Sequence, residues 1–296
     1  MATKIKKKTV SFYEIMDENG RSFPQPLPWE KVLARLAQQP VTQREHELWD
    51  VAHWGKTYTY LDRDHFVLAR SRVEGVPSLD VNADEIIDNE TDVQKPWVEI
   101  SVASFVPDTN IFGFVLGSQA SPRPASIAAW LNAHKIFDKF ITVGPVVSKD
   151  ILAKLNGAAQ AKLVRVKLTR DQIRATRQSN GLFSAARGIT EEHGDVEVEL
   201  IVRVSGRVKR DHDEERIQIL ETARGLLSTD FKFAVAELIN FNDKGKPEYE
   251  PVNLLENRLA KKMDVSVTDD EGNPIRIQSA VTAILRAIDA LGDELR

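Results

Sequence analysis

Residues 196–204 read Val-Glu-Val-Glu-Leu-Ile-Val-Arg-Val, with valine or leucine at every second position. Side chains alternate between the two faces of a strand, so this pattern predicts a β-strand with one buried face. After it we expect an amphipathic helix over 213–227 and a returning strand over 231–241. Strands and helices that interleave without the regular spacing of parallel β-α-β units favour an α+β fold.

The rest of the chain continues this mixed pattern. Further strands are predicted over 9–15, 45–52, 57–61, 65–70, 97–106, 111–116, 140–147 and 163–168. Further helices are predicted over 29–38, 127–131, 149–155, 170–178, 254–263 and 279–295, with Ser148, Thr169 and Ser279 as expected N-caps. Gly55 and Lys56 are expected to form the turn between the strands over 45–52 and 57–61. With 296 residues the chain is long enough for about two domains. We therefore predict two mixed α/β domains with largely antiparallel sheets, divided into residues 1–148 and 149–296.

The composition excludes several classes of protein. The chain has no cysteine, which removes thiol catalysis, disulfide frameworks and thiolate metal sites. No apolar run approaches the roughly 18 residues of a membrane span, and the lysine-rich start is not followed by an apolar signal segment. We therefore expect a soluble, cytoplasmic protein.

Charge is unevenly distributed along the chain. The 40 basic and 44 acidic residues give a net charge of −4, so the whole molecule is not a general binder of polyanions. Residues 80–92 nevertheless carry acids and no base, whereas residues 162–187 carry many bases and one acid, Asp171. A run of charge also fits a solvated face without any binding role.

Within the basic stretch, Arg170, Arg174 and Arg177 recur at helical spacing and would share one helix face. Guanidinium groups bind phosphate bidentately and stay charged, so this stripe is a candidate DNA-binding surface. The alternative is structural, with the arginines paired to Glu191, Glu192 or the acidic residues of 80–92.

A second basic corner precedes the helix over 213–227. It consists of Arg207, Lys209 and Arg210. Contacts from such groups to phosphates would be insensitive to sequence, because phosphates carry no base information.

Catalytic motifs are weak by comparison. Asp62, Asp64 and His65 could form a small metal corner, but a turn between strands explains the same residues. A metal-dependent nuclease is the enzymatic alternative, because Asp108 and the pair Asp230 and Lys232 imitate two pieces of a nuclease motif, although far apart in sequence. We name no catalytic residue, metal ligand or cofactor.

The order of several features resembles that of the RexA-like phage-exclusion proteins and, more distantly, the KwaB-like antiphage defence proteins. The resemblance rests on Ile111-Phe112-Gly113-Phe114, the helix at 127–131, the strand at 141–146 and Val208-Lys209-Arg210-Asp211. It implies a cytoplasmic, non-enzymatic homodimer that binds duplex DNA without sequence preference and acts with a membrane effector partner. By position it implies that Lys209 and Arg210 are DNA contacts or part of a dimer hinge.

Three hypotheses follow from the sequence. The leading one is a DNA-binding sensor in phage exclusion or antiviral defence by abortive infection. The others are a metal-dependent nuclease and a protein-interaction module of a phage or defence system. A homodimer is also predicted from the wide apolar face of the terminal helix at 279–295.

Overall fold

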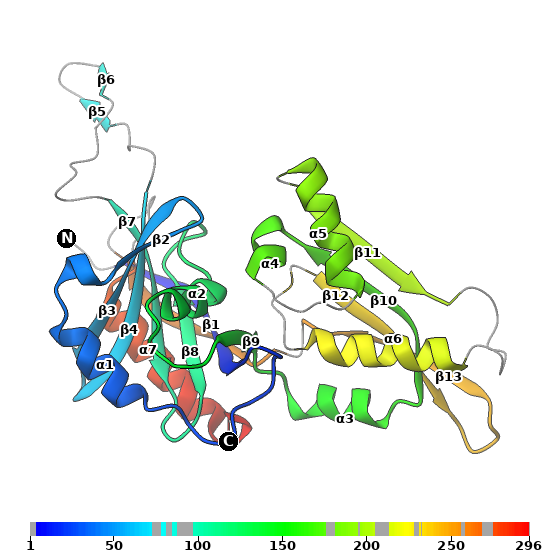
Figure 1. The fold of residues 1–296 in the computed structure, drawn as a ribbon. Helices are drawn as coiled ribbons and strands as arrows, with labels where there is room; N and C mark the ends of the chain where they lie inside the picture. Colours follow the sequence, from blue (N-terminus) through cyan, green and yellow to red (C-terminus); the bar gives the residue numbers. More distant parts are fainter. Residues whose placement is uncertain are drawn as a thin grey trace.

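The structure is a computed structural model that describes residues 4–72, 78–80, 85–87, 97–175, 181–194, 196–204, 213–227, 231, 233–255, 258–267 and 275–295. Its helices and antiparallel strands form an α+β fold, as the sequence predicted (Figure 1). Two main sheets are present in the described residues, and each has its own buried core. We call them the first and second sheets.

The first sheet has eight strands in the order β14-β1-β8-β7-β4-β3-β2, with β9 also paired to β1. Its strands are β1 (Lys4–Asp17), β2 (Glu45–Leu48), β3 (Val51–Tyr60), β4 (Arg63–Ser71), β7 (Val98–Phe105), β8 (Ile111–Leu116), β9 (Ile141–Pro145) and β14 (Ala260–Val267). A separate hairpin of β5 (Ser78–Asp80) and β6 (Glu85–Ile87) lies between β4 and β7 in the chain.

Helices cover both faces of the first sheet. Helices α1 (Trp29–Gln38) and α2 (Pro124–Ala133) pack on one face, and α7 (Ile277–Leu291) packs on the other. Strand β1 is buried on both faces: Tyr13 and Ile15 pack in the core beneath α1 and α2, while Val10 and Phe12 pack in the core beneath α7. A strand with apolar side chains on both faces needs both faces of its sheet to be covered, and here helices cover both.

The C-terminal part of the chain returns to the first sheet. Strand β14 pairs with β1, and α7 buries its apolar side chains against the same sheet. The predicted division at 148/149 assigned these residues to a C-terminal domain, whereas their backbone pairing lies with the N-terminal strands. The apolar face of α7 is covered within the chain, so the reason given for a homodimer was wrong.

The described part of the region predicted as a helix at 254–263, which leaves out residues 256–257, is not helical. Strand β13 (Pro247–Asn253) precedes it, and β14 begins within it. Leu259 donates its backbone N–H to Val146, and the alternating Val265 and Val267 are fully buried. Burial of alternate side chains against α7 outweighs the helix propensity of the Leu-Ala-Lys-Lys segment.

The second sheet has the order β11-β10-β12-β13. Its strands are β10 (Gln160–Leu168), β11 (Val198–Arg203), β12 (Phe233–Phe241) and β13, and its helices are α3 (Lys149–Gly157), α4 (Arg170–Ala175), α5 (Gly181–His193) and α6 (Asp213–Leu226). All these helices contribute to one core with the inward side chains of the strands. The opposite face of the sheet therefore has no helix over it among the described residues.

Several local predictions can be compared with the structure. Ser148 caps α3 by accepting from the N–H of Ile151 at 3.4 Å, as predicted. Gly55, predicted to lie in a turn, lies inside β3, and the turn is formed by Trp49 and Asp50 with positive φ values. Helix α5 was not predicted, and Ser279 does not cap α7, which starts at Ile277.

Candidate nucleic-acid interface

The predicted arginine stripe starts at the first residue of α4. The side chain of Arg170 is half-buried there, and the backbone of Arg174 belongs to the same helix. The side chain of Arg174 and the whole of Arg177 lie outside the described residues. The second corner, formed by Arg207, Lys209 and Arg210, also lies outside them. The stripe and the corner therefore stay predictions.

The start of α4 is fixed by reciprocal hydrogen bonds. The backbone N–H of Thr169 donates to Oε1 of Gln172 at 3.0 Å, and the N–H of Gln172 donates to Oγ1 of Thr169 at 3.4 Å. This is the capping-box arrangement, and it confirms the predicted cap at Thr169. Ile173 is 1% exposed and packs in the core of the second sheet, which holds α4 in place.

Three other bases of the stretch 162–187 lie on β10, on the face of the second sheet that no described helix covers. Each is paired with a carboxylate on a neighbouring strand or directly before it. The pairs are Lys162–Glu237 at 3.2 Å, Arg165–Glu199 at 2.6 Å and Lys167–Glu197 at 2.6 Å. The Lys167 pKa is raised by its hydrogen bond to Glu197 and the attraction of that carboxylate. These three bases are locally neutralised and do not form an open cationic surface.

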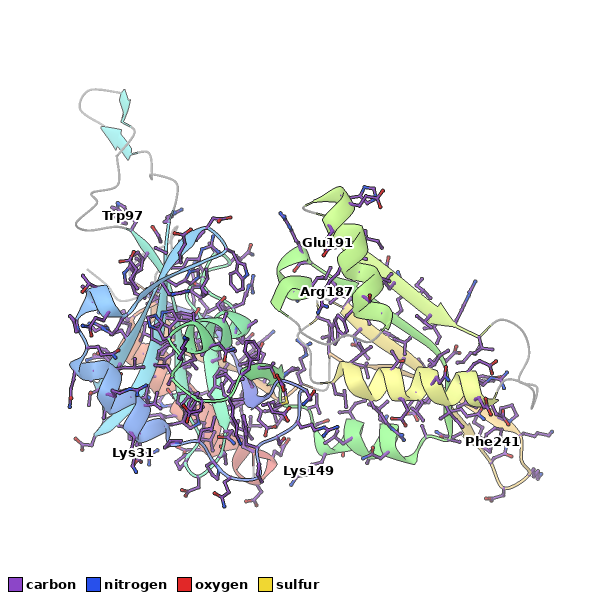
Figure 2. The ribbon with its side chains drawn as sticks, in the orientation of Figure 1. Lys31, Trp97, Lys149, Arg187, Glu191 and Phe241 are labelled. Atoms are coloured by element: carbon purple, nitrogen blue, oxygen red, sulfur yellow. The ribbon has the colours of Figure 1, made fainter. Side chains whose placement is uncertain are left out.

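Aromatic rings also hold two of these side chains on the sheet. The guanidinium carbon of Arg165 lies 5.4 Å from the ring centroid of Phe233, and Nζ of Lys162 lies 4.9 Å from that of Tyr249. The sequence analysis considered Glu191, Glu192 and residues 80–92 as partners of the arginine stripe. The acids that pair with these three bases lie instead on β12, on β11 and directly before β11. On α5, Arg187 and Glu191 lie one helical turn apart (Figure 2).

A different cationic surface is formed by the two strands at the β14 edge of the first sheet. We call it the lysine ribbon. It consists of Lys4, Lys6, Lys7 and Lys8 of β1 and Lys261 and Lys262 of β14. The antiparallel register places Lys262 opposite Thr9 and Lys261 opposite Val10. Lysines more than 250 residues apart in sequence thereby become near neighbours.

Lysines lie on both faces of this ribbon because side chains alternate along a strand. Lys7 and Lys262 share one face as diagonal neighbours, while Lys8 and Lys261 are diagonal neighbours on the other. Diagonal pairs in an antiparallel ladder are about 7–8 Å apart. Lys7, Lys261 and Lys262 are exposed, so their ammonium groups are open to solvent and ligands.

The balance of charge on the ribbon is positive. The paired segments 4–11 and 260–267 contain six lysines and a single acidic residue, Asp264, which lies opposite Lys7. The Lys8 pKa is lowered by burial and then by the charge of Lys6, and its Nζ donates to the carbonyl of Gly117 at 2.9 Å. The lysines at the start of the chain are evident in the sequence, but no sequence pattern predicts that Lys261 and Lys262 lie beside them.

The predicted metal corner at residues 62–65 has a structural explanation. Leu61 and Asp62 form the tight turn between β3 and β4, both with positive φ. Oδ1 of Asp64 accepts a hydrogen bond from Thr59 at 2.6 Å, and Nε2 of His65 donates to the carbonyl of Tyr60 at 3.1 Å. Among the described residues, no three or more histidine, aspartate or glutamate side chains lie together in a way that could hold a metal ion.

Buried histidines make the stability of the first sheet sensitive to acid. His65 is 2% exposed, and its Nδ1 has no hydrogen-bond partner in the described part of the chain. Burial lowers the pKa values of His53, His65 and His134 below the ordinary 6.5. These histidines therefore bind a proton more readily in the unfolded chain than in the folded one. The stability contributed by the neutral histidines is complete above about pH 6.5. It falls as the pH drops from there through the lower pKa values of the folded protein.

We expect thermal unfolding to occur at a lower temperature at pH 5.5 than at pH 7.5. His65→Gln keeps a side-chain donor but does not titrate, so it should make this decrease smaller. The difference between variant and parent is the useful quantity, because burial raises the Glu14 pKa and that group acts in the opposite direction. An identical pH dependence in both proteins would show that His65 does not contribute.

Only one piece of the proposed nuclease motif, Asp108, lies within the described residues, so the motif stays a prediction. Asp108 lies in the turn between β7 and β8 with a φ of 57°. Asp230 and Lys232 lie outside the described residues.

Neither membrane-spanning helices nor relatives of known function point to a role for this site. No helix among the described residues is long and apolar enough to cross a membrane. No protein-family model matches the chain, and no curated protein matches it.

Proposed function

We propose that the protein binds double-stranded DNA without reading its sequence, with the lysine ribbon as its main phosphate-binding surface. The observation that carries this proposal is the β1–β14 register, which gathers lysines from two distant segments with Asp264 as the acid between them. The predicted groups Arg170, Arg174 and Arg177, and Arg207, Lys209 and Arg210, would form a second surface.

The chemistry of the ribbon favours phosphates over bases. An ammonium group is a compact point charge with rotatable donors, so it accepts many phosphate positions but does not fix the geometry of one base edge. Duplex DNA carries condensed cations along its phosphates, and lysines that neutralise these phosphates release the cations, which makes binding strongly dependent on salt.

The cellular role is a proposal from the resemblance to RexA-like proteins. In it the protein is a non-enzymatic, cytoplasmic sensor of phage infection that acts with a membrane effector. A genome neighbourhood containing a small gene for a multi-pass membrane protein would support this role.

The salt dependence of binding tests the proposal directly. If about six phosphates are neutralised, affinity for any duplex should fall about a thousandfold between roughly 50 and 200 mM salt. A mobility-shift series with two duplexes of unrelated sequence measures this, and both should give the same slope. Weak binding that does not change with salt would rule out a phosphate-dominated interface.

Charge reversal distinguishes the two surfaces. We expect Lys261→Glu with Lys262→Glu to weaken binding to every duplex at least about tenfold and to reduce the salt slope by about two. The matched control is Lys31→Glu with Arg35→Glu on the exposed face of α1, where Lys31 is labelled in Figure 2. Helix α1 packs on β3 and β4, which are separated from β14 and β1 in the sheet order. Lys209→Glu with Arg210→Glu tests the second surface in the same assay. Unchanged binding by the first variant would exclude the ribbon, whatever the others do.

A further inference from the structure

The edges of the two sheets are not equally protected against pairing with another strand. Exposed edges are normally blocked by charge, by proline or by being very short. The edge strand β13 contains Pro247 and Pro251, β2 has four residues, and β14 carries Lys261 and Lys262. Strand β11 is the edge of the second sheet and has the sequence Val-Glu-Leu-Ile-Val-Arg, with no proline and no lysine (Figure 1).

The backbone of β11 directs alternate peptide groups out of the sheet. Val204 donates its N–H to the carbonyl of Lys162 on β10 at 3.2 Å. Inward and outward groups alternate along an antiparallel strand, so the even residues of β11 bond to β10. The N–H and C=O groups of Glu199, Ile201 and Arg203 consequently point away from β10, toward the open side of the strand.

The side chains of the same three residues lie on the face without helices. Ile201 is 53% exposed, which is unusual for a large aliphatic side chain in a strand. Arg203 is exposed as well, and no ion pair of its side chain is found within the described residues. Glu199 already binds Arg165 on the inner side, but its other oxygen is available to a cation approaching from the edge.

We propose that β11 pairs antiparallel with β11 of a second copy of this chain, about a two-fold axis at Ile201. In this register Ile201 lies opposite its own equivalent, and Glu199 lies opposite Arg203 of the other copy. Each outward N–H then meets an outward C=O, and the two second sheets join into one continuous sheet. The symmetric pairing is isologous, so it closes at two copies and does not form a fibre.

Charge disfavours the registers centred on Glu199 and on Arg203. Pairing centred two residues earlier along the ladder places Glu199 opposite Glu199, and the corresponding shift in the other direction places Arg203 opposite Arg203. Like charges directly opposite destabilise a ladder, whereas opposite charges stabilise it. In the selected register Glu199 lies between Arg165 of its own chain and Arg203 of the second copy. This inference is independent of DNA binding.

Charge exchange tests the register. Arg203→Glu places two acids opposite each other at both ends of the pairing, so we expect the dimer dissociation constant to rise at least about tenfold. Glu199→Arg should do the same, and the double variant Glu199→Arg with Arg203→Glu should return toward the parent value. Sedimentation equilibrium over a range of concentrations gives these constants. A parent protein that stays monomeric at its highest soluble concentration, or single variants that dimerise as the parent does, would overturn the proposal.

A second experiment uses the absence of cysteine in the chain. Ile201→Cys puts one thiol on the two-fold axis, where facing Cα atoms are about 5.5 Å apart, within the range that a disulfide spans. Mild oxidation should give a covalent dimer. Ile217→Cys, at another exposed isoleucine in α6, is the matched control and should remain mostly monomeric. Equal cross-linking of both variants would indicate random collision and contradict the interface.

A proline variant separates assembly from folding. Ile201→Pro removes an outward N–H and no bond to β10, so the monomer should fold with an unchanged circular dichroism spectrum while the dimer is lost. Val202→Pro removes an inward N–H and should instead lower the unfolding temperature. A folded Ile201→Pro variant that still dimerises would place the interface elsewhere.

Discussion

We expect the replacement of Trp130 by alanine to lower the free energy of unfolding by about 3–5 kcal/mol. Trp130 is the largest of the fully buried side chains and sits on α2, with its ring 5.5 Å from that of Phe66. Its Nε1 donates to the carbonyl of Arg44 at 3.2 Å. The variant therefore creates a cavity and also leaves this carbonyl without its side-chain donor.

Denaturant unfolding monitored by circular dichroism measures this effect. Trp97→Ala is the control, because Trp97 is 55% exposed and a surface change of this kind should cost less than about 0.5 kcal/mol. If the two variants were equally stable, α2 would not be packed against the sheet as described.

Valine in place of Gly113 destabilises the fold by about 3 kcal/mol, because the site has no room for a side chain. Gly113 lies in β8 directly below α7, and a Cβ atom there would lie 2.5 Å from Cγ2 of Ile284 and 3.2 Å from the ring of Phe12. Ile284 is fully buried, so it cannot move aside without displacing the helix. The close approach of α7 to the sheet requires glycine at this position.

A double-mutant cycle tests that contact. Ile284→Ala alone should cost about 2–4 kcal/mol through loss of burial. Combined with Gly113→Ala it should cost at least about 1 kcal/mol less than the sum of the two single variants, because the added methyl group occupies the vacated space. Strictly additive changes would mean that the two residues do not touch.

Short-range patterns in the sequence were sufficient for much of the fold. The alternation at 196–204 predicted β11, and the helical spacing from Trp29 to Leu36 predicted α1 with its bounds. The caps at Ser148 and Thr169 were also predicted, because a hydroxyl acting on a backbone N–H three residues ahead is a local interaction.

Pairings between distant segments could not be predicted in this way. Nothing near Lys261 indicates that it lies opposite Val10, because strand register depends on burial against α7 and on the rest of the sheet. For the same reason the neutralisation of Arg165 by Glu199 was missed, although both residues lie in segments that were predicted as strands. The lysine ribbon and the ion-paired face of the second sheet therefore emerged from the structure alone.

The placement of β14 and α7 has a consequence for the order of events during synthesis. These elements leave the ribosome after the whole second sheet, yet they complete the ladder and the core that begin at β1. The segment at residues 148–255 can therefore fold first. Until α7 is synthesised, one face of the sheet formed by the N-terminal strands has no helix to cover it. Domains usually fold in the order in which they emerge, and we expect this chain to reverse that order.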